Sequence, residues 1–164
     1  MGLVEFISAL NMLHDKARKG PLSTNEQSDY DGARETLARS MLQMQKIALP
    51  PGGKAREYVR APKMVQVEVQ VPGGRMSVAT MELWGRGFAA LLAEGLPLNK
   101  SVNVQVKLRP GVVIECEAIP TEAKRQASNF RVAFDFDGVK QEDVDRILLV
   151  VFDEVLAKLA QAKR

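Results

Sequence analysis

The sequence has little with which to build a catalytic or metal centre, since it contains one cysteine, one histidine and one tryptophan among 164 residues. A single cysteine excludes an internal disulfide. One histidine and one cysteine also exclude a metal site made of clustered imidazole and thiolate ligands. Aromatic residues make up only 5% of the chain, and the strand-like segments show no row of stacking side chains of the kind that binds single-stranded nucleic acid.

Long apolar runs are missing as well. The longest is "ILLVVF" at 147–152, far below the roughly 18 residues of a membrane-spanning helix. The amino terminus lacks the charged, apolar and small-residue order of a secretory signal. Hydrophobic residues reach 46% and charged residues 26%, a mixture typical of a folded globular protein. We therefore expect a cytoplasmic protein with one domain and helical extensions.

The residues that most often carry catalysis stand in unremarkable settings. His14 lies in an amphipathic helical segment with no nucleophile or carboxylate arranged around it, so a solvated or edge-of-core role is expected. Cys116 alternates with Ile114 and Ala118 in a strand-like run, which predicts an inert core thiol. "DFDG" at 135–138 lacks the spaced oxygen ligands of a calcium loop. We predict no enzyme, no metal and no cofactor.

The first 50 residues have the pattern of a helical pair. Residues 2–19 place apolar side chains on one face, and residues 26–49 carry a narrower stripe that runs from Tyr30 through Met41 and Met44, opposite a polar face that includes Arg34. That stripe would fit packing within the chain or a helix-mediated homodimer equally well. "LPPGGKA" at 49–55 ends the second helix. The pattern predicts an amino-terminal helical extension over 1–50.

From residue 65 the hydrophobic period changes from that of a helix to that of strands. Valines alternate with polar residues over 65–71, and "PGG" at 72–74 is typical of a hairpin turn. The six predicted strands are 65–71, 75–83, 88–92, 101–108, 112–119 and 129–136. Six short strands separated by turns predict an antiparallel β-barrel over 54–139, so the fold class is mainly β with added helices.

The last segment, 140–164, is predicted to be a helix over 140–161. Its apolar face is wide, because Leu149 and Val150 extend the stripe set by Ile147 and Val151. We expect this helix to pack on both the barrel and the amino-terminal helices.

Two arginines precede the first strand at a spacing of four. Arg56 and Arg60 are flanked by Lys54 and Lys63 in "KAREYVRAPK". Two guanidinium groups held close together suit a phosphodiester, because each donates bidentate, charge-assisted hydrogen bonds. The net charge of +3 permits an anionic partner.

The only tryptophan follows the second strand, in "MELWGRGF" at 81–88. Here Glu82, Trp84 and Gly87 have the spacing of an Asp/Asn-x-Ser-x-x-Gly signature. Trp84 would serve as a packing anchor, as a plug, or as a platform on which a planar ligand stacks, and its register predicts a position near the arginine segment. Arg75 and Arg86 would either extend a positive surface around it or serve as solvated turn charges.

The order of these two motifs on a six-stranded barrel with a closing helix resembles the PilZ family, a family of bacterial receptors for cyclic dimeric GMP (c-di-GMP). The resemblance covers about residues 54–136 and the final helix. The helical pair resembles extensions of some deltaproteobacterial members. By this resemblance Arg56 and Arg60 hold phosphates and a guanine face, and Gly87 lets backbone approach the other guanine.

Two positions depart from the family pattern. Glu82 stands where the family has Asp or Asn, and Trp84 stands where it has Ser. Each lost polar contact costs about 1.5 to 3 kcal/mol, so two weaken binding by roughly a hundredfold or more. An indole that stacks on guanine returns about 1 to 3 kcal/mol.

The resemblance implies a regulatory module of motility or of the cell surface. Our leading hypothesis is a signalling adaptor that acts through a protein partner, with c-di-GMP binding weak or lost. A functional c-di-GMP receptor is the second hypothesis, and a basic barrel that binds nucleic acid through the Lys54–Lys63 segment is the third.

Overall fold

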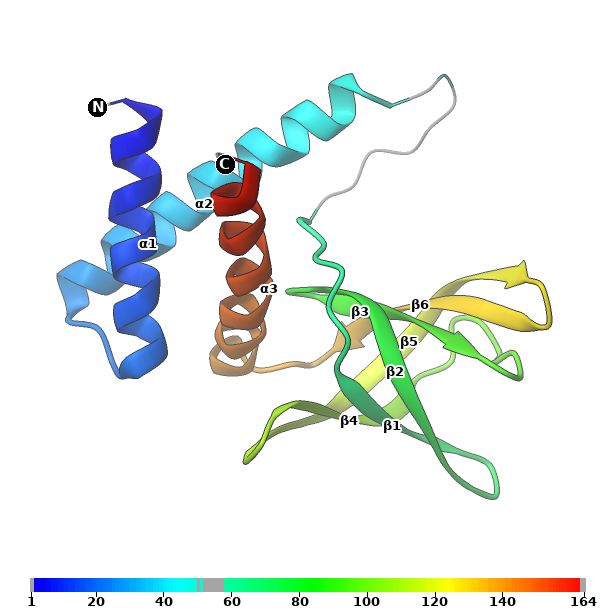
Figure 1. The fold of residues 1–164 in the computed structure, drawn as a ribbon. Coiled ribbons are helices and arrows are strands. Elements are labelled where there is room, and N and C mark those ends of the chain that lie inside the picture. The colour runs from blue at the N-terminus through cyan, green and yellow to red at the C-terminus, as the bar shows by residue number, and fades with distance from the viewer. Residues whose placement is uncertain (1, 50, 52–57, 163–164) are drawn as a thin grey trace. The chain divides into compact units, whose positions relative to one another are not determined.

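The computed structural model describes residues 2–49, 51 and 58–162, and the chain divides into two compact units, Met1–Val59 and Arg60–Arg164 (Figure 1). The boundary that the sequence predicts at 49–55 falls shortly before this division, largely on residues outside the described ranges. Within those ranges, no helix combines the length and the apolar character that crossing a membrane requires.

The amino-terminal unit consists of two helices, α1 (Leu3–Lys19) and α2 (Thr24–Ile47). At the start of α1 the Gly2 N–H donates to Glu5 Oε2 at 2.9 Å. At α2 the Glu26 backbone N–H donates to Ser23 Oγ at 3.1 Å, and the Ser23 N–H donates to Glu26 Oε1 at 3.2 Å, which forms a capping box. Lys16 of α1 also pairs with Glu26, and this contact, with the two from Ser23, lowers the pKa of the Glu26 carboxyl.

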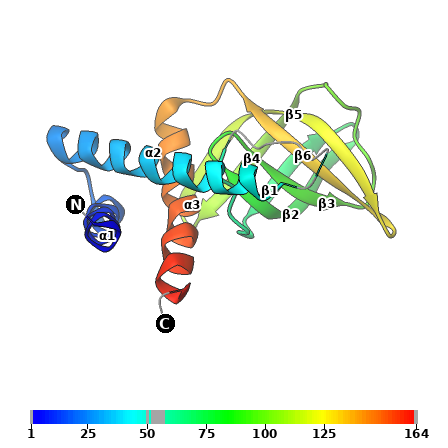
Figure 2. The same ribbon diagram turned by 90° about the horizontal axis from the view of Figure 1, so that it is seen from above.

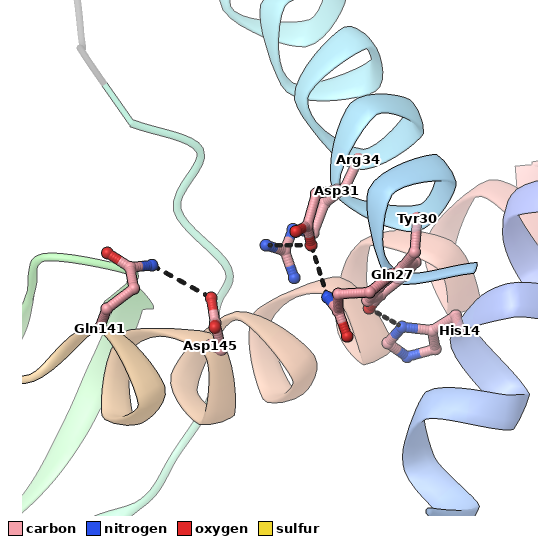
Figure 3. Close-up of polar contacts among 7 residues, drawn as sticks. All are labelled: His14, Gln27, Tyr30, Asp31, Arg34, Gln141 and Asp145. Carbon is pink, nitrogen blue, oxygen red and sulfur yellow. Dashed lines mark hydrogen bonds and ion pairs between the residues drawn. The ribbon is translucent and has the colours of Figure 1, made fainter. Parts of the chain in front are cut away.

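Polar side chains are part of the buried surface of this unit, which the sequence did not predict. His14 is buried, and its Nδ1 lies 2.7 Å from the Tyr30 hydroxyl (Figure 3). Arg34 is buried too, stacked 5.0 Å from the Tyr30 ring centroid and paired with Asp31. The prediction that Arg34 lies on the polar face of the helix is therefore wrong, because residues 30, 34 and 37 share one buried face. Met44, expected in the stripe, is 71% exposed.

The second unit contains a closed, antiparallel six-stranded barrel with the strand order β1-β2-β3-β6-β5-β4, which confirms the predicted fold class. The strands and the helix that follows are β1 (Gln66–Val71), β2 (Gly74–Trp84), β3 (Gly87–Leu92), β4 (Val102–Arg109), β5 (Val112–Gln126), β6 (Asn129–Asp137) and α3 (Gln141–Ala162). Alternating valines such as Val67 and Val69 fill the interior. Phe88 of β3 stacks on Phe134 of β6, with ring centroids 4.6 Å apart.

The strand β5 is longer than the sequence predicts, because it continues past Ile119 to Gln126 and stays paired with β6 to the turn. The resulting β5–β6 hairpin projects from the body of the barrel in both views (Figures 1 and 2). Its outer residues, 121–126, are all exposed, so they lack the buried alternation by which the other strands were found. Strand β2 also runs one residue further than expected and includes Trp84.

The helix α3 packs on the barrel where β2 turns into β3. A Cβ at Gly85, in that turn, would lie 2.9 Å from Leu148 Cδ2 of α3, so the glycine permits close approach. The Gln141 amide donates to Asp145 at 3.2 Å near the start of α3 (Figure 3). Packing on the barrel agrees with the sequence analysis, and packing on the amino-terminal helices stays a prediction.

A buried threonine fixes the segment that enters the barrel. The Thr80 hydroxyl of β2 donates to the Lys63 carbonyl at 2.6 Å and accepts from the Val65 N–H at 2.9 Å. Its backbone N–H donates to the Val65 carbonyl at 3.0 Å. These bonds position residues 61–65 on the barrel.

We expect Thr80→Val to lower the free energy of unfolding by about 1 to 3 kcal/mol, because the isosteric side chain leaves buried backbone groups of Lys63 and Val65 without partners. Urea denaturation followed by circular dichroism measures this loss. The exposed strand residue Thr121 gives the control: its hydroxyl donates one long hydrogen bond, to the Ala133 carbonyl at 3.3 Å, where water can replace it, so Thr121→Val should cost less than about 1 kcal/mol. Equal effects of the two substitutions would contradict this role for Thr80.

Candidate functional site

The candidate site begins where the segment that precedes β1, residues 60–65 (the entering segment), pairs with the end of β2. The Ala61 N–H donates to the Leu83 carbonyl and the Leu83 N–H donates to the Ala61 carbonyl, both at 2.8 Å. Extending this antiparallel register by one residue places Arg60 opposite Trp84, on the same face of the sheet. The predicted proximity of Trp84 to the arginine segment is confirmed.

A β-bulge decides which side chains of the second motif face outward. Thr80 pairs with Ala90 and Glu82 pairs with Ala89, so Met81 is the extra residue. Without the bulge, strict alternation from the buried Thr80 would turn Glu82 into the core. With it, Leu83 enters the core at 0% exposure, and Glu82 and Trp84 share the outer face of the barrel.

On that face the indole of Trp84 lies over small residues. Trp84, Ala89 and Ala133 form a buried cluster, and Trp84 is only 2% exposed. Gly87 lies directly opposite Trp84 in the register, and a Cβ there would lie 3.1 Å from an indole carbon. The other side of the ring faces Arg60, whose guanidinium carbon is 3.9 Å from the ring centroid, a cation–π contact. Trp84 is therefore a covered side chain rather than an open stacking platform.

Glu82 lies between two guanidinium groups from different parts of the chain. Its Oε1 atom is 3.9 Å from Arg60 Nη1, and the same oxygen accepts a hydrogen bond from Arg131 Nη2. Arg131 comes from β6, and it reaches β2 across β3 because Ala89 and Ala133 between them are small (Figure 1). The three charged side chains are each about one-fifth exposed.

Arg131 is a residue of this site that the sequence analysis missed. It lies 49 residues from Glu82 in the chain, outside both motifs. The available signal was its strand alternation with Ala133, which places both on one face once β6 is known to pair with β3.

Of the other predicted basic residues, the structure describes Lys63, Arg75 and Arg86. Lys54 and Arg56 lie outside the described residues. Lys63 pairs with Glu154 of α3 at 3.5 Å, and Arg86 is exposed in the β2–β3 turn, where its carbonyl accepts from the Phe136 N–H.

Arg75 lies far from Trp84, which leaves its reading as a charge at the hairpin turn. It begins β2 while Trp84 ends it, so the two lie roughly 30 Å apart along the strand at about 3.3 Å per residue. Arg75 instead lines a groove of about 560 Å³ on the opposite wall of the barrel, together with acidic residues that include Glu68, Glu115 and Glu117.

The two residues considered for catalysis belong to different units of the chain. His14 belongs to the amino-terminal unit and contacts Tyr30. Cys116 lies in β5, where burial, reinforced by the Asp143 and Glu117 carboxylates, raises the pKa of its thiol to about 11. A thiol of that pKa is almost fully protonated at neutral pH and is a poor nucleophile. Among the described residues, no group of three or more His, Cys, Asp or Glu side chains is placed to hold a metal ion.

The fold matches solved PilZ structures. The inhibitor of motility from Bacillus subtilis (MotI/DgrA) aligns at 19% identity and a TM-score of 0.57, over 65% of this chain and 53% of that chain. The PilZ domain of YcgR from Escherichia coli, solved with c-di-GMP, aligns at 15% identity and a TM-score of 0.54, over 68% and 99% of the two chains. The MrkH–c-di-GMP complex of K. pneumonia aligns at 13% identity and a TM-score of 0.58, over 68% and 57%.

These likenesses show that the chain has a PilZ-like fold. The aligned region spans about half the length of the motility inhibitor. No protein-family model matches the sequence, and neither does any curated protein.

We expect Gly87→Ala to destabilise the chain by about 2 to 4 kcal/mol, because the added Cβ would lie 2.0 Å from the Phe134 carbonyl oxygen of β6 and would push on the indole. Thermal and urea unfolding measure the loss. Gly95→Ala is the matched control, since a Cβ there meets nothing within 4 Å, and it should leave stability unchanged or slightly raised. A Gly87→Ala variant as stable as Gly95→Ala would contradict the close packing of Trp84 and β6.

Proposed function

We propose that the protein is a non-enzymatic PilZ-type signalling adaptor whose c-di-GMP binding is weak or lost. The observation that carries this proposal is that Trp84, the central residue of the second motif, is covered by protein and only 2% exposed. A guanine that stacked on Trp84 would have to displace either the Arg60 guanidinium or the barrel wall at Gly87, Ala89 and Ala133. Neither face of the indole is offered to a ligand.

The charges support the same proposal. The Arg60 guanidinium, which would hold a phosphate, already has the Glu82 carboxylate 3.9 Å away. A ligand phosphate would have to break this ion pair and the cation–π contact with Trp84 before it gained any contact of its own. Two interactions of about 0.5 to 2 kcal/mol each would lower affinity by roughly five- to several hundredfold.

By analogy with the motility inhibitor that shares its fold, we propose that the protein regulates bacterial motility or cell-surface machinery through a protein partner in the cytoplasm. Exposed apolar side chains on the helical pair would supply contact area, among them Met12 of α1 and Met44 and Ile47 of α2. A helix-mediated homodimer would use the same side chains.

The second candidate is a working c-di-GMP receptor. The features that favour it are the two guanidinium groups of Arg60 and Arg131 on one face and a glycine at position 87. Nucleic-acid binding gains less support, because Arg60 and Lys63 are both paired with carboxylates.

Titration of the full chain with c-di-GMP distinguishes the first two candidates. We expect no calorimetric heat and no change in Trp84 fluorescence up to about 100 μM ligand. A Glu82→Asp, Trp84→Ser double variant, which restores the residues of the family motif, should gain roughly a hundredfold in affinity by recovering two polar contacts.

The control is the same double variant with Arg60→Ala, which should lose the gain. A wild-type chain that binds c-di-GMP with a low-micromolar Kd would refute the proposed function in favour of the receptor.

A further inference from the structure

The outer half of β5 has an open edge. Strand β4 pairs with β5 only between Val112 and Ala118, whereas β6 follows β5 to the turn. Among the described residues, no strand pairs with the other side of residues 121–126. All six of these residues are exposed, and they lie in the hairpin that projects from the barrel (Figures 1 and 2). We call residues 121–126 the β5 edge.

The register with β6 shows which backbone groups point toward this edge. A two-residue turn at 127–128 joins the two strands, so the flanking residues Gln126 and Asn129 exchange both of their hydrogen bonds. Every second pair along an antiparallel ladder is hydrogen-bonded in this way. The N–H and C=O groups of Ala123 and Arg125 fall between these pairs, so they point away from β6 and toward the open side.

The charges of the β5 edge are arranged symmetrically about Ala123. Glu122 precedes it and Lys124 follows it, and both side chains lie on one face of the strand. The two pair with each other at 3.5 Å, yet the glutamate is 61% exposed and the lysine 69% exposed. A strand with opposite charges at equal distances from a central residue is complementary to an antiparallel copy of itself.

We propose that two copies of the chain pair through the β5 edge, antiparallel and about a two-fold axis at Ala123. The two copies of Ala123 lie opposite each other and exchange two backbone hydrogen bonds. Glu122 of each copy lies opposite Lys124 of the other, in a pair whose Cα atoms are about 4.5 Å apart. The inference goes beyond the proposed function, because it does not depend on whether c-di-GMP binds.

The charges favour this register over its neighbours. Since the backbone groups that face the edge recur at every second residue, the two-fold axis passes through a residue and not between two. An axis at Glu122 would set two glutamates directly opposite each other, and an axis at Lys124 would do the same with two lysines. An axis at Arg125 would oppose two arginines. Like charges directly opposite destabilise a sheet, so the axis lies at Ala123, where opposite charges meet.

The same residues limit the size of the contact. Charges on an edge strand commonly prevent pairing, because an edge of one sign repels its own copy, but Glu122 and Lys124 have opposite signs. Pro120, which has no N–H, lies at the inner end of the edge, and the register with β6 shifts just after it. A pairing over 121–125 buries less than the roughly 1,200 Å² of a stable interface. We therefore expect a weak dimer that forms as the protein concentration rises.

Charge reversal tests the pairing of side chains. Sedimentation velocity of the full chain at low salt, between about 10 μM and 1 mM, should show a monomer–dimer equilibrium. Glu122→Lys and Lys124→Glu should each weaken the dimer at least about tenfold, because each turns two attractive pairs into repulsive ones. The double variant Glu122→Lys, Lys124→Glu should restore the dimer, since its edge is again complementary to itself.

The matched control is Lys107→Glu. Lys107 is a strand lysine that is 44% exposed and also pairs with a glutamate, Glu68, at 3.6 Å. This substitution changes the net charge by the same amount as Lys124→Glu, so it separates the effect of the β5 edge from general repulsion between copies. It should change the dimer dissociation constant by less than about threefold.

Disulfide cross-linking tests the position of the axis. In a Cys116→Ser background, Ala123→Cys places two thiols at the two-fold axis, where Cα atoms about 5.5 Å apart are within disulfide range. Gln126→Cys is the control, because the two copies of residue 126 would lie about 20 Å apart along the paired strands. Under mild oxidation, Ala123→Cys should cross-link at least about tenfold faster than Gln126→Cys.

Four results would overturn the proposal. They are a chain that stays monomeric at every concentration, a dimer that neither single reversal weakens, a charge-swapped double variant that remains monomeric, and equal cross-linking at positions 123 and 126. The second result would assign the dimer to another surface, such as the helical pair. Circular dichroism verifies that each variant is folded, and if a charge variant is not folded, the cross-linking comparison decides.

Discussion

The packing of Trp84 between a floor of small residues and the Arg60 guanidinium is the contact on which this face of the barrel depends. The floor consists of Gly87 and Ala89 of β3 and Ala133 of β6, and none of these has a side chain large enough to lift the indole. Arg60 closes the ring from the other side at 3.9 Å. The entering segment, two strands of the barrel and the second motif are thereby joined through one side chain.

The charges around this contact follow from the same geometry. Because the bulge at Met81 turns Glu82 outward with Trp84, the carboxylate lies where it contacts Arg60 and, across Ala89, Arg131. A partly buried carboxylate between two guanidinium groups is stabilised by both. The entering segment, β2 and β6 are thereby linked by charge as well as by packing.

Much of the fold could be predicted from the sequence, because its signals are local. The valines of 65–71, the "PGG" turn and the closing helix each depend on neighbouring residues only. The predicted six-stranded antiparallel barrel is the one observed. The outer half of β5 was missed because it is exposed on both faces, and Arg34 was misplaced because a charged residue gave no sign of its stacking on Tyr30.

The site was predictable only in part. The spacing of Arg60, Glu82, Trp84 and Gly87 indicated that they share one site, and the structure brings these four together. The bulge at Met81 leaves no mark in the alternation of apolar residues, and Arg131 becomes a neighbour only through the pairing of β6 with β3. Both depend on long-range strand register, which a single sequence does not encode locally.

The central claim is that Trp84 is closed on both faces, and collisional quenching of its fluorescence tests this most directly because it is the only tryptophan in the chain. Acrylamide should quench the native protein far less than the urea-unfolded chain, and Arg60→Ala should raise the quenching constant of the folded protein severalfold. A native Trp84 that acrylamide quenches as readily as it does in the unfolded chain, or one that Arg60→Ala leaves unchanged, would contradict the account.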